Sequence, residues 1–234
     1  IDGTACKGDI TIPENITHIV TSAFSKSEEL TAIYVDENNK NYTSENGVLF
    51  NKNKTTLVSY PIGNTAKEYT IPDGVVNIED EAFFRCENLT SVIIPDGVKN
   101  IGNYAFYWCN GLLSVDISDT VESIGEYAFN NCNDLISIKI PDSVTSLGMA
   151  AVSSCYGLET AEIGNGVRKI DDYTFSYCKN LTFVTIGNNV EHIGELAFQA
   201  CQKLESVTIP DSVISIGNSA FKGCSSVTSI TIPD

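Results

Sequence analysis

The chain has 234 residues, of which 42% are hydrophobic, including 10 Phe and 10 Tyr, so it can bury a core and is not a disordered chain. Its formal net charge of −16 repels phosphate backbones and anionic lipid, which excludes nucleic acid and membrane surfaces as expected partners. The sequence has no apolar run approaching the ~18 residues of a membrane-spanning helix, so we expect no direct membrane insertion.

The N-terminal residues 12–35, "IPENITHIVTSAFSKSEELTAIYV", contain the first copy of a repeated pattern. Ile12, which opens this copy, lies 59 residues before Ile71, which opens the first of the regular copies. That distance equals one 23-residue unit and one 36-residue unit, so we expect the second unit to contain an insertion.

From Ile71 onward the pattern returns every 23 residues without an insertion or a deletion. The isoleucine that marks each copy recurs at Ile71, Ile94, Ile117, Ile140, Ile163, Ile186, Ile209 and Ile232. The condensed unit reads I-P-D-x-V-x-x-I-G-x-x-A-F-x-x-C-x-x-L-x-x-V-x, and Val152 is the one break in its phenylalanine row. Units of this length that repeat in register predict a solenoid, in which each coil buries its apolar side chains against its neighbours.

Two apolar spacings alternate within a unit. In residues 89–94 the spacing falls to two, which predicts a short strand, and Pro95 and Asp96 then end the strand with a turn. In residues 98–109 the spacing is three and four, which predicts a short extended segment followed by a helical or 3₁₀ turn around "YAFYWC". Stacked copies would place the strands in one parallel sheet, with the short segments on the opposite wall.

The unit "IPDGVKNIGNYAFYWCNGLLSV" (94–115) and its copies closely resemble the leucine-rich repeats of the BspA-like surface proteins. The segment "YTSENGVLFNKNKTTLVSYP" (42–61) resembles the hairpin insert of the same family. The resemblance implies an α/β fold, a right-handed leucine-rich-repeat solenoid with a parallel β-sheet on the concave face and short extended, 3₁₀ or helical turns on the convex side. It implies a single domain over residues 1–234, with an N-terminal unit (1–35), a hairpin insert (36–70) and seven regular 23-residue repeats (71–234).

A cysteine recurs at one position of every regular unit. The row is Cys86, Cys109, Cys132, Cys155, Cys178, Cys201 and Cys224, and Ser27 holds the same place upstream. Adjacent Cα atoms would lie about 5 Å apart, which a disulfide tolerates, but side chains stacked in parallel do not readily reach the near-90° dihedral that a disulfide needs. We therefore expect free buried thiols, with disulfides as the alternative. The chain has no C-x-x-C pair, so we expect no metal site here, and Cys6 lies outside the row.

The sequence contains no arrangement typical of a catalytic site. His18 and His192 occupy the same repeat position on coils about seven apart, roughly 30 Å at the ordinary strand spacing, so they cannot share a site. G-x-S-x-G, H-E-x-x-H and phosphate-binding glycine loops are missing from the sequence. We therefore expect a protein that is not an enzyme, with no catalytic residues and no cofactor.

An acidic column follows the predicted strands. It contains Asp73, Asp96, Asp119, Asp142, Asp211 and Asp234, with Asn165 and Asn188 in the other units. Stacked carboxylates could bind calcium. The Asn residues argue against this role, because Asn can replace Asp as an acceptor of hydrogen bonds from backbone N–H groups but does not supply the negative charge that attracts an ion. We favour the turn-capping interpretation and assign no metal ligand.

The outward face of the predicted strands is the candidate partner-binding surface, because a solenoid usually binds through such a face. Most of its positions are Ser or Thr, as in a solvated sheet. The exceptions are Ile93, Leu113, Asp116, Ile136, Lys139, Glu162 and Phe183. A rival surface is an aromatic group on the turn side, Tyr104, Tyr107, Trp108, Tyr127, Tyr173 and Tyr177, since Tyr and Trp are favoured at interfaces.

The family resemblance implies a secreted or cell-surface module for adhesion, with an extracellular protein or glycan, including host matrix, as its ligand. The alternative is a structural spacer or targeting scaffold for another domain on the C-terminal side. The last residues, "ITIPD", begin a fresh unit, so we expect the natural chain to continue.

Overall fold

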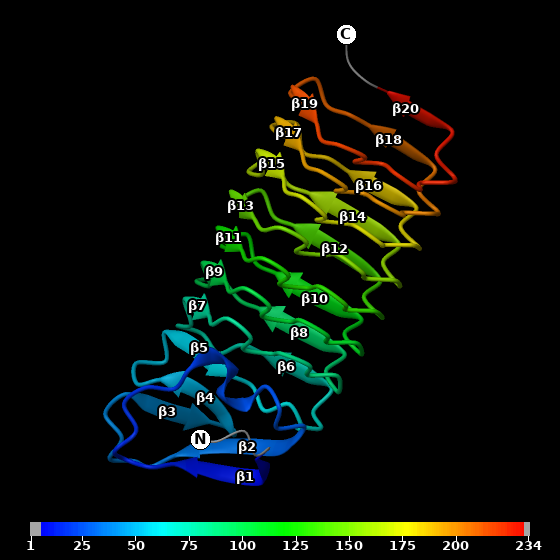
Figure 1. Cartoon of the computed structure of the whole chain (residues 1–234). Coiled ribbons are helices and arrows are strands. Elements are labelled where there is room, and N and C mark those ends of the chain that lie inside the picture. Colours follow the sequence, from blue (N-terminus) through cyan, green and yellow to red (C-terminus); the bar gives the residue numbers. More distant parts are fainter. Residues whose placement is uncertain (1–5, 232–234) are drawn as a thin grey trace.

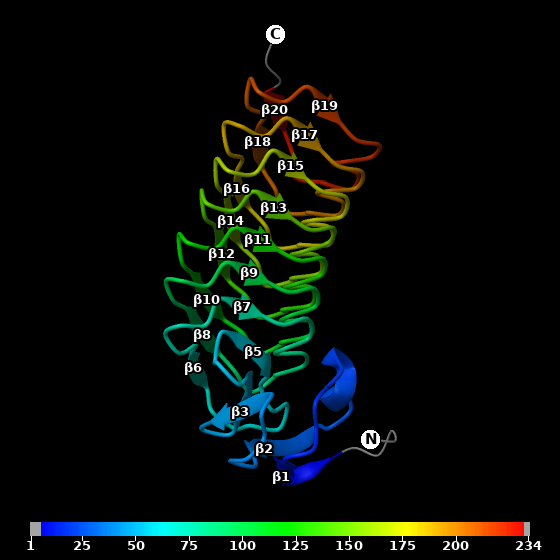
Figure 2. The ribbon, with the colours of Figure 1, turned by 90° about the vertical axis from the view of Figure 1, so that its left-hand side faces the viewer.

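A computed structural model describes residues 6–231 as a stack of coils, with the N-terminal unit at one end and the last coil at the other (Figure 1). Marker residues Ile232 and Asp234 lie outside the described residues. Each regular coil contributes a long strand, a short strand and a run of turns, and Figure 2 shows the coils stacked with the short strands toward the viewer. The architecture is a β-solenoid with parallel sheets.

The long strands form one face of the stack, here called the long-strand face. They are β1 (Lys7–Ile12), β2 (Glu29–Val35), β6 (Glu68–Thr70), β8 (Ser91–Ile94), β10 (Ser114–Ile117), β12 (Ser137–Ile140), β14 (Thr160–Ile163), β16 (Phe183–Thr185), β18 (Ser206–Thr208) and β20 (Ser229–Thr231). From β6 onward they pair in parallel with a shift of one repeat, as where Ser114 lies opposite Ser91, but they form three separate sheets: β6–β8–β10, β12–β14–β16 and β18–β20. The predicted strand at 91–94 and its parallel pairing are therefore confirmed, whereas the prediction of one continuous sheet was wrong.

The short strands form a second row, the short-strand wall. They are β5 (Thr56–Ser59), β7 (Asn77–Ile78), β9 (Asn100–Ile101), β11 (Ser123–Ile124), β13 (Ser146–Leu147), β15 (Lys169–Ile170), β17 (His192–Ile193) and β19 (Ser215–Ile216). The wall continues into an antiparallel hairpin, because β5 also pairs with β4 (Val48–Asn51), and β4 pairs with β3 (Tyr42–Glu45). The division of the chain into one domain with three parts remains a prediction.

The third side of each regular coil, here the turn wall, is not helical. At residues 103–109 and their copies, alternate N–H groups donate to the next coil, as from Phe83 to the oxygen of Ala105 over 2.7 Å. The N–H groups between them donate locally, as from Phe84 to Glu81 over 3.0 Å. Tyr104 has φ of 55°, in the left-handed region, which an α-helix does not contain.

The predicted helical or 3₁₀ turns of the repeats, and with them the α/β class, were therefore wrong. Among residues 6–231 the one helical element is the 3₁₀ turn η1 (Thr21–Phe24) in the N-terminal unit. The right hand of the coil and the concavity of the long-strand face remain predictions.

The core runs along the inside of the stack as columns of identical positions. Phe106 stacks on Phe83 with ring centroids 4.6 Å apart and on Phe129 at 5.0 Å, and all three side chains are fully buried. Val152 interrupts the column, which resumes where Phe175 stacks on Phe198 at 5.4 Å. A second, smaller cluster fills the N-terminal unit and the hairpin, and includes Leu30, Ile33 and Leu49.

Candidate binding surface

The alternation of each long strand decides which side chains reach the long-strand face. In β16, Val184 is buried while Phe183 and Thr185 point outward, and Phe183 is 55% exposed. All seven predicted residues lie exposed on or beside this face: Ile93, Leu113, Asp116, Ile136, Lys139, Glu162 and Phe183. Their exposure agrees with the prediction, but their role in binding remains a proposal.

The structure brings some of these residues together. Lys139 and Glu162 are opposite each other on the adjacent strands β12 and β14. Leu113 and Ile136 directly precede the strands β10 and β12, and the N–H of Ile136 donates to the oxygen of Leu113 over 3.2 Å. Asp116 lies opposite Ile93.

The apolar members do not form one continuous patch. Phe183 lies opposite Thr160, and Glu159 follows Ile136 in the same repeat column, so polar residues separate Phe183 from Ile136. The face is therefore a mosaic of apolar and polar positions and not a single hydrophobic surface.

A groove of about 500 Å³ opens at the carboxyl ends of β12, β14 and β16. Its long-strand contributors are Lys139, Glu162 and Thr185, and its turn contributors include Asp142, Asn165 and Asn188. Carboxylate, amide, hydroxyl and ammonium groups therefore surround one space, only two residues along β16 from Phe183.

The sequence analysis named these turn residues in the acidic column, but it did not place them in one groove with Lys139 and Glu162, although the sequence carried a signal. Two units replace the usual I-P-D with I-G-N, at residues 163–165 and 186–188. A Cβ on Gly164 would lie 2.5 Å from the carbonyl carbon of Pro141, and a Cβ on Gly187 would lie 2.4 Å from the oxygen of Gly164. Glycine at these two positions therefore lets neighbouring turns approach closely below the groove.

The acidic column ties neighbouring turns together at this groove. Asp142 accepts the backbone N–H of Asn165 over 2.7 Å, and Asn165 accepts the backbone N–H of Asn188 over 2.9 Å. The side chains accept from backbone N–H groups, as predicted, but each bond joins two successive coils and does not close the turn of its own residue, so the turn-capping prediction was wrong at these two positions. Residues 6–231 contain no group of three His, Cys, Asp or Glu side chains placed to hold a metal ion.

None of the cysteines and histidines of the described residues lines this groove. All eight cysteines are free, and six of the seven in the repeat row are buried. His192 hydrogen-bonds Ser215 over 2.7 Å on the short-strand wall, whereas His18 lines an apolar pocket in the N-terminal unit.

Within the described part of the chain, no helix is long and apolar enough to cross a membrane.

The turn-side aromatics occupy a different wall of the stack. Tyr104 and Tyr127 stack with ring centroids 5.0 Å apart and planes 3° apart. Trp108, Tyr173 and Tyr177 are exposed. The two candidate surfaces are therefore separate, and a ligand could use either one without the other.

Comparison with known proteins identifies relatives of the whole repeat array. A family model described as "BspA type Leucine rich repeat region" matches in six copies, over residues 7–67, 60–182 and 169–234. A leucine-rich cell surface protein from Faecalibacterium prausnitzii is 34% identical, with a TM-score of 0.70, over 75% of this chain and 47% of that one. A leucine-rich repeat protein from Eubacterium ventriosum is 30% identical, with a TM-score of 0.70, over 96% of this chain and 60% of that one.

A more distant structure shares the fold alone. The pneumococcal vaccine antigen PcpA is 21% identical, with a TM-score of 0.68, over 97% of this chain and 56% of that one. A comparison with curated proteins finds no match. The chain thus spans about half to three fifths of the length of these structures.

Proposed function

Because the chain belongs to the BspA-type leucine-rich repeat family, we propose that it is a non-enzymatic module that binds an extracellular protein or glycan through the long-strand face. The observation that carries this proposal is that Phe183 is exposed at the start of β16, while Thr185 at the end of the same strand lines the groove with Lys139 and Glu162. A single exposed apolar residue needs no explanation, but one that lies two residues along a strand from a polar groove places the two parts of a binding site on one face.

The two parts would have different roles in recognition. Phe183 offers a large apolar side chain whose burial under a partner is favourable. The groove offers donors and acceptors that orient the partner and reject one with the wrong pattern of polar groups. Phe183 and the strand residues of the groove belong to a sheet whose inner side is packed into the core. The surface therefore loses little conformational entropy when a partner binds.

The same proposal places the protein outside the cell, secreted or at the cell surface. Its support is the cell-surface description of the relative that is 34% identical. Proteolysis of intact producing cells tests this placement, because a surface protein is digested while a cytoplasmic marker survives.

Binding is tested by screening the purified chain against immobilised extracellular matrix proteins and an array of glycans. For any ligand found, we expect Phe183→Ala to weaken the affinity about fivefold or more, as for a residue at the centre of an interface. Lys139→Glu should also weaken binding, since it reverses a charge in the groove. Ile214→Ala is the matched control, because Ile214 is an apolar residue that is 75% exposed just before β19, on another wall.

Unchanged affinity in both face variants would contradict the proposed surface. A screen in which neither matrix proteins nor glycans bind would favour the alternative role of a spacer for another domain.

A further inference from the structure

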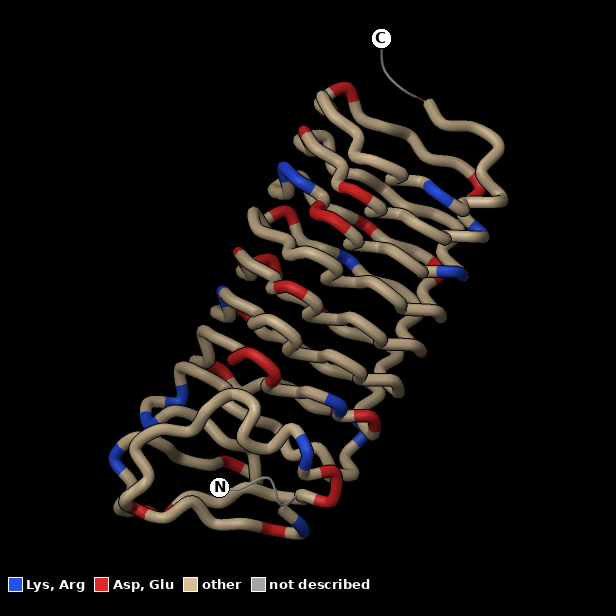
Figure 3. The backbone as a smooth tube through the Cα atoms, viewed as in Figure 1, with Lys and Arg blue, Asp and Glu red and all other residues tan. Residues whose placement is uncertain are grey.

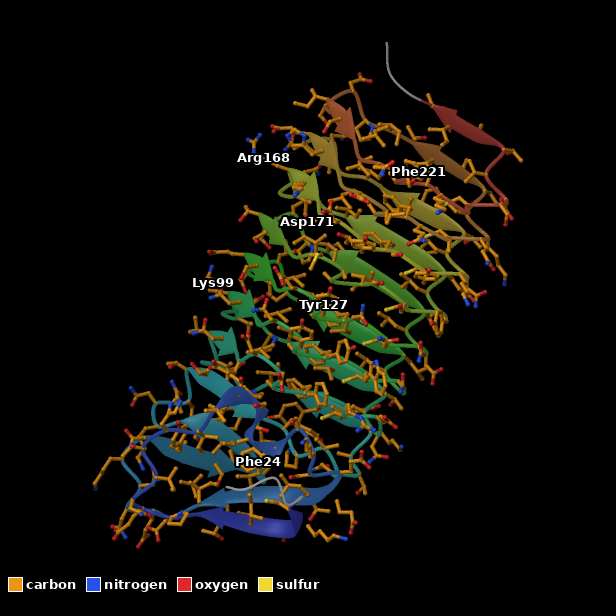
Figure 4. All side chains as sticks on the ribbon, in the orientation of Figure 1. Phe24, Lys99, Tyr127, Arg168, Asp171 and Phe221 are labelled. Carbon is orange, nitrogen blue, oxygen red and sulfur yellow. The ribbon has the colours of Figure 1, made fainter. Side chains whose placement is uncertain are left out.

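The turn wall holds a second surface whose chemistry differs from that of the long-strand face. Tyr104, Tyr107 and Tyr127 form a cluster here called the tyrosine corner, in which Tyr104 stacks on Tyr127 at 5.0 Å and meets Tyr107 edge-on at 5.5 Å. All three side chains are partly exposed. Figure 4 shows that Tyr127 lies midway along the stack, away from both ends.

Two carboxylates flank the tyrosine corner. Glu126 directly precedes Tyr127, and its backbone oxygen accepts the N–H of Tyr104 over 2.8 Å, while Glu81 occupies the position of Tyr104 in the preceding coil. The pKa of Tyr104 is raised by partial burial, and also by the nearby Tyr127 and the charges of Glu126 and Glu81.

Neither of these carboxylates is neutralised by a basic side chain of the described residues, unlike the paired carboxylates of the short-strand wall. Lys99 pairs with Glu122 over 2.7 Å, and Arg168 pairs with Glu191, both along the short-strand wall, where Figure 4 shows Lys99 and Arg168 at its outer edge. In residues 6–231 no ion pair involves Glu81 or Glu126. The tube view shows how few Lys and Arg residues the regular coils contain (Figure 3).

The chain itself shows what aromatic rings on these coils can hold. The guanidinium of Arg85 lies 5.6 Å from the ring centroid of Trp108 and pairs with Glu28 over 2.6 Å. The ammonium of Lys179 lies 4.8 Å from the ring centroid of Tyr156. In the first of these sites a cation is held by a ring and a carboxylate together, and the tyrosine corner combines the same two kinds of group.

We propose that the tyrosine corner, with Glu81 and Glu126, is a docking site for an arginine- or lysine-rich segment of a partner protein. A cationic side chain would lie against the tyrosine rings while its charge faces the two carboxylates. The net charge of −16 would attract such a segment from a distance and would oppose docking of a second copy of this chain. This site is independent of the long-strand face and of the function proposed there.

The test uses fluorescein-labelled nona-arginine as the probe and measures its affinity by fluorescence anisotropy in dilute buffer and at high salt. We expect binding that weakens with salt, and we expect Tyr104→Ala and Tyr127→Ala each to weaken it about two- to fivefold. Tyr34→Ala is the matched control, because Tyr34 is an exposed tyrosine on β2, at the N-terminal end of the stack. An uncharged Gly/Ser peptide of the same length should not bind.

A second pair of variants separates this site from general attraction to an acidic protein. Glu126→Gln and Glu205→Gln each remove one exposed carboxylate, but only Glu126 lies at the tyrosine corner. We expect Glu126→Gln to weaken binding about two- to fivefold and Glu205→Gln to leave it nearly unchanged. Neither change removes a buried group, so both variants should fold, which a thermal melt verifies.

Equal losses in the two glutamate variants, with no effect of either tyrosine variant, would overturn the proposal, and so would equal binding of the uncharged peptide. Phe183→Ala should leave this binding intact, so failure at one surface does not decide the other.

Discussion

The thiol of Cys109 donates a hydrogen bond over 3.0 Å to the backbone oxygen of Phe83, in the preceding coil. The same oxygen accepts the backbone N–H of Cys86 over 3.1 Å. Five further pairs repeat this contact along the stack: Cys132 with Phe106, Cys155 with Phe129, Cys178 with Val152, Cys201 with Phe175, and Cys224 with Phe198. The cysteine row therefore joins coils through weak S–H···O contacts and supplies small apolar side chains to the core.

This burial predicts unreactive thiols in the folded protein. Burial raises the pKa of Cys109 to about 12, so almost no reactive thiolate forms at pH 8. We expect a thiol reagent to label native protein mainly at the partly exposed Cys6 and Cys224, and to label all eight cysteines after unfolding without reductant. Mass spectrometry of the labelled protein counts the sites, and fewer than eight in unfolded protein would show that disulfides had formed.

The phenylalanine column predicts a large loss of stability for Phe129→Ala. Phe129 is fully buried and stacks on Phe106 at 5.0 Å, so the truncation leaves a cavity that costs ~3–5 kcal/mol. Ser137→Ala, on the exposed side of β12, should change the free energy of unfolding very little. Urea unfolding followed by circular dichroism compares the two variants, and equal shifts of the midpoint would contradict the core assignment.

The spacing between coils predicts that Gly102→Ala is destabilising. A Cβ at this position would lie 2.5 Å from the backbone nitrogen of Asp80 and 2.6 Å from its Oδ1, so two coils would have to move apart. We expect a loss of about 1–3 kcal/mol, as for an overpacked core site. Ser114→Ala, on the exposed long-strand face, is the control, and a thermal midpoint for Gly102→Ala that equals the control would rule out this close approach.

The carboxylates of Glu79 and Glu81 predict higher stability at mildly acidic pH. Burial, and then the charge of Asp80, raise the pKa of both groups above their ordinary value of 4.5. The folded chain then binds protons more tightly than the unfolded chain, so the stability contributed by these groups is present below pH 4.5 and is lost as the pH rises through the raised value.

We therefore expect the thermal midpoint to rise when the pH is lowered from 7 toward 5, and the net charge of −16 favours the same direction by self-repulsion at neutral pH. The double variant Glu79→Gln, Glu81→Gln should raise the midpoint at pH 7 and reduce its dependence on pH. An unchanged pH dependence in this variant would contradict the role of the two groups.

The alternation of residues along the strands predicted which side chains of the candidate site are exposed, but it did not predict the groove. The outward position of Phe183 was predictable, because side chains alternate along a strand whose buried residues were already known. The groove beside it forms where strand ends and turns from several coils meet. Its volume depends on how closely Gly164 and Gly187 let those turns approach, and no single unit of the sequence contains that information.

The prediction of a helical turn in residues 98–109 was wrong for a related reason. The apolar spacing in residues 98–109 fits one face of a helix, but it fits equally a coil that bends at Gly102 and has a left-handed residue at Tyr104. The two structures differ in the partner of each N–H group. In a helix the partner lies four residues away, whereas here Phe106 donates to Ala128 in the next coil.

The sequence by itself determined the repeat, its length of 23 residues, the long strands and the identity of the buried columns. It could do so because every coil packs against a copy of itself, so the same apolar requirement recurs at the same position. Only the tertiary structure decided the turn wall, the thiol contact from Cys109 to Phe83, and the groove beside Phe183. Each of these depends on the distance and direction between atoms of different coils, which the order of residues within one coil does not specify.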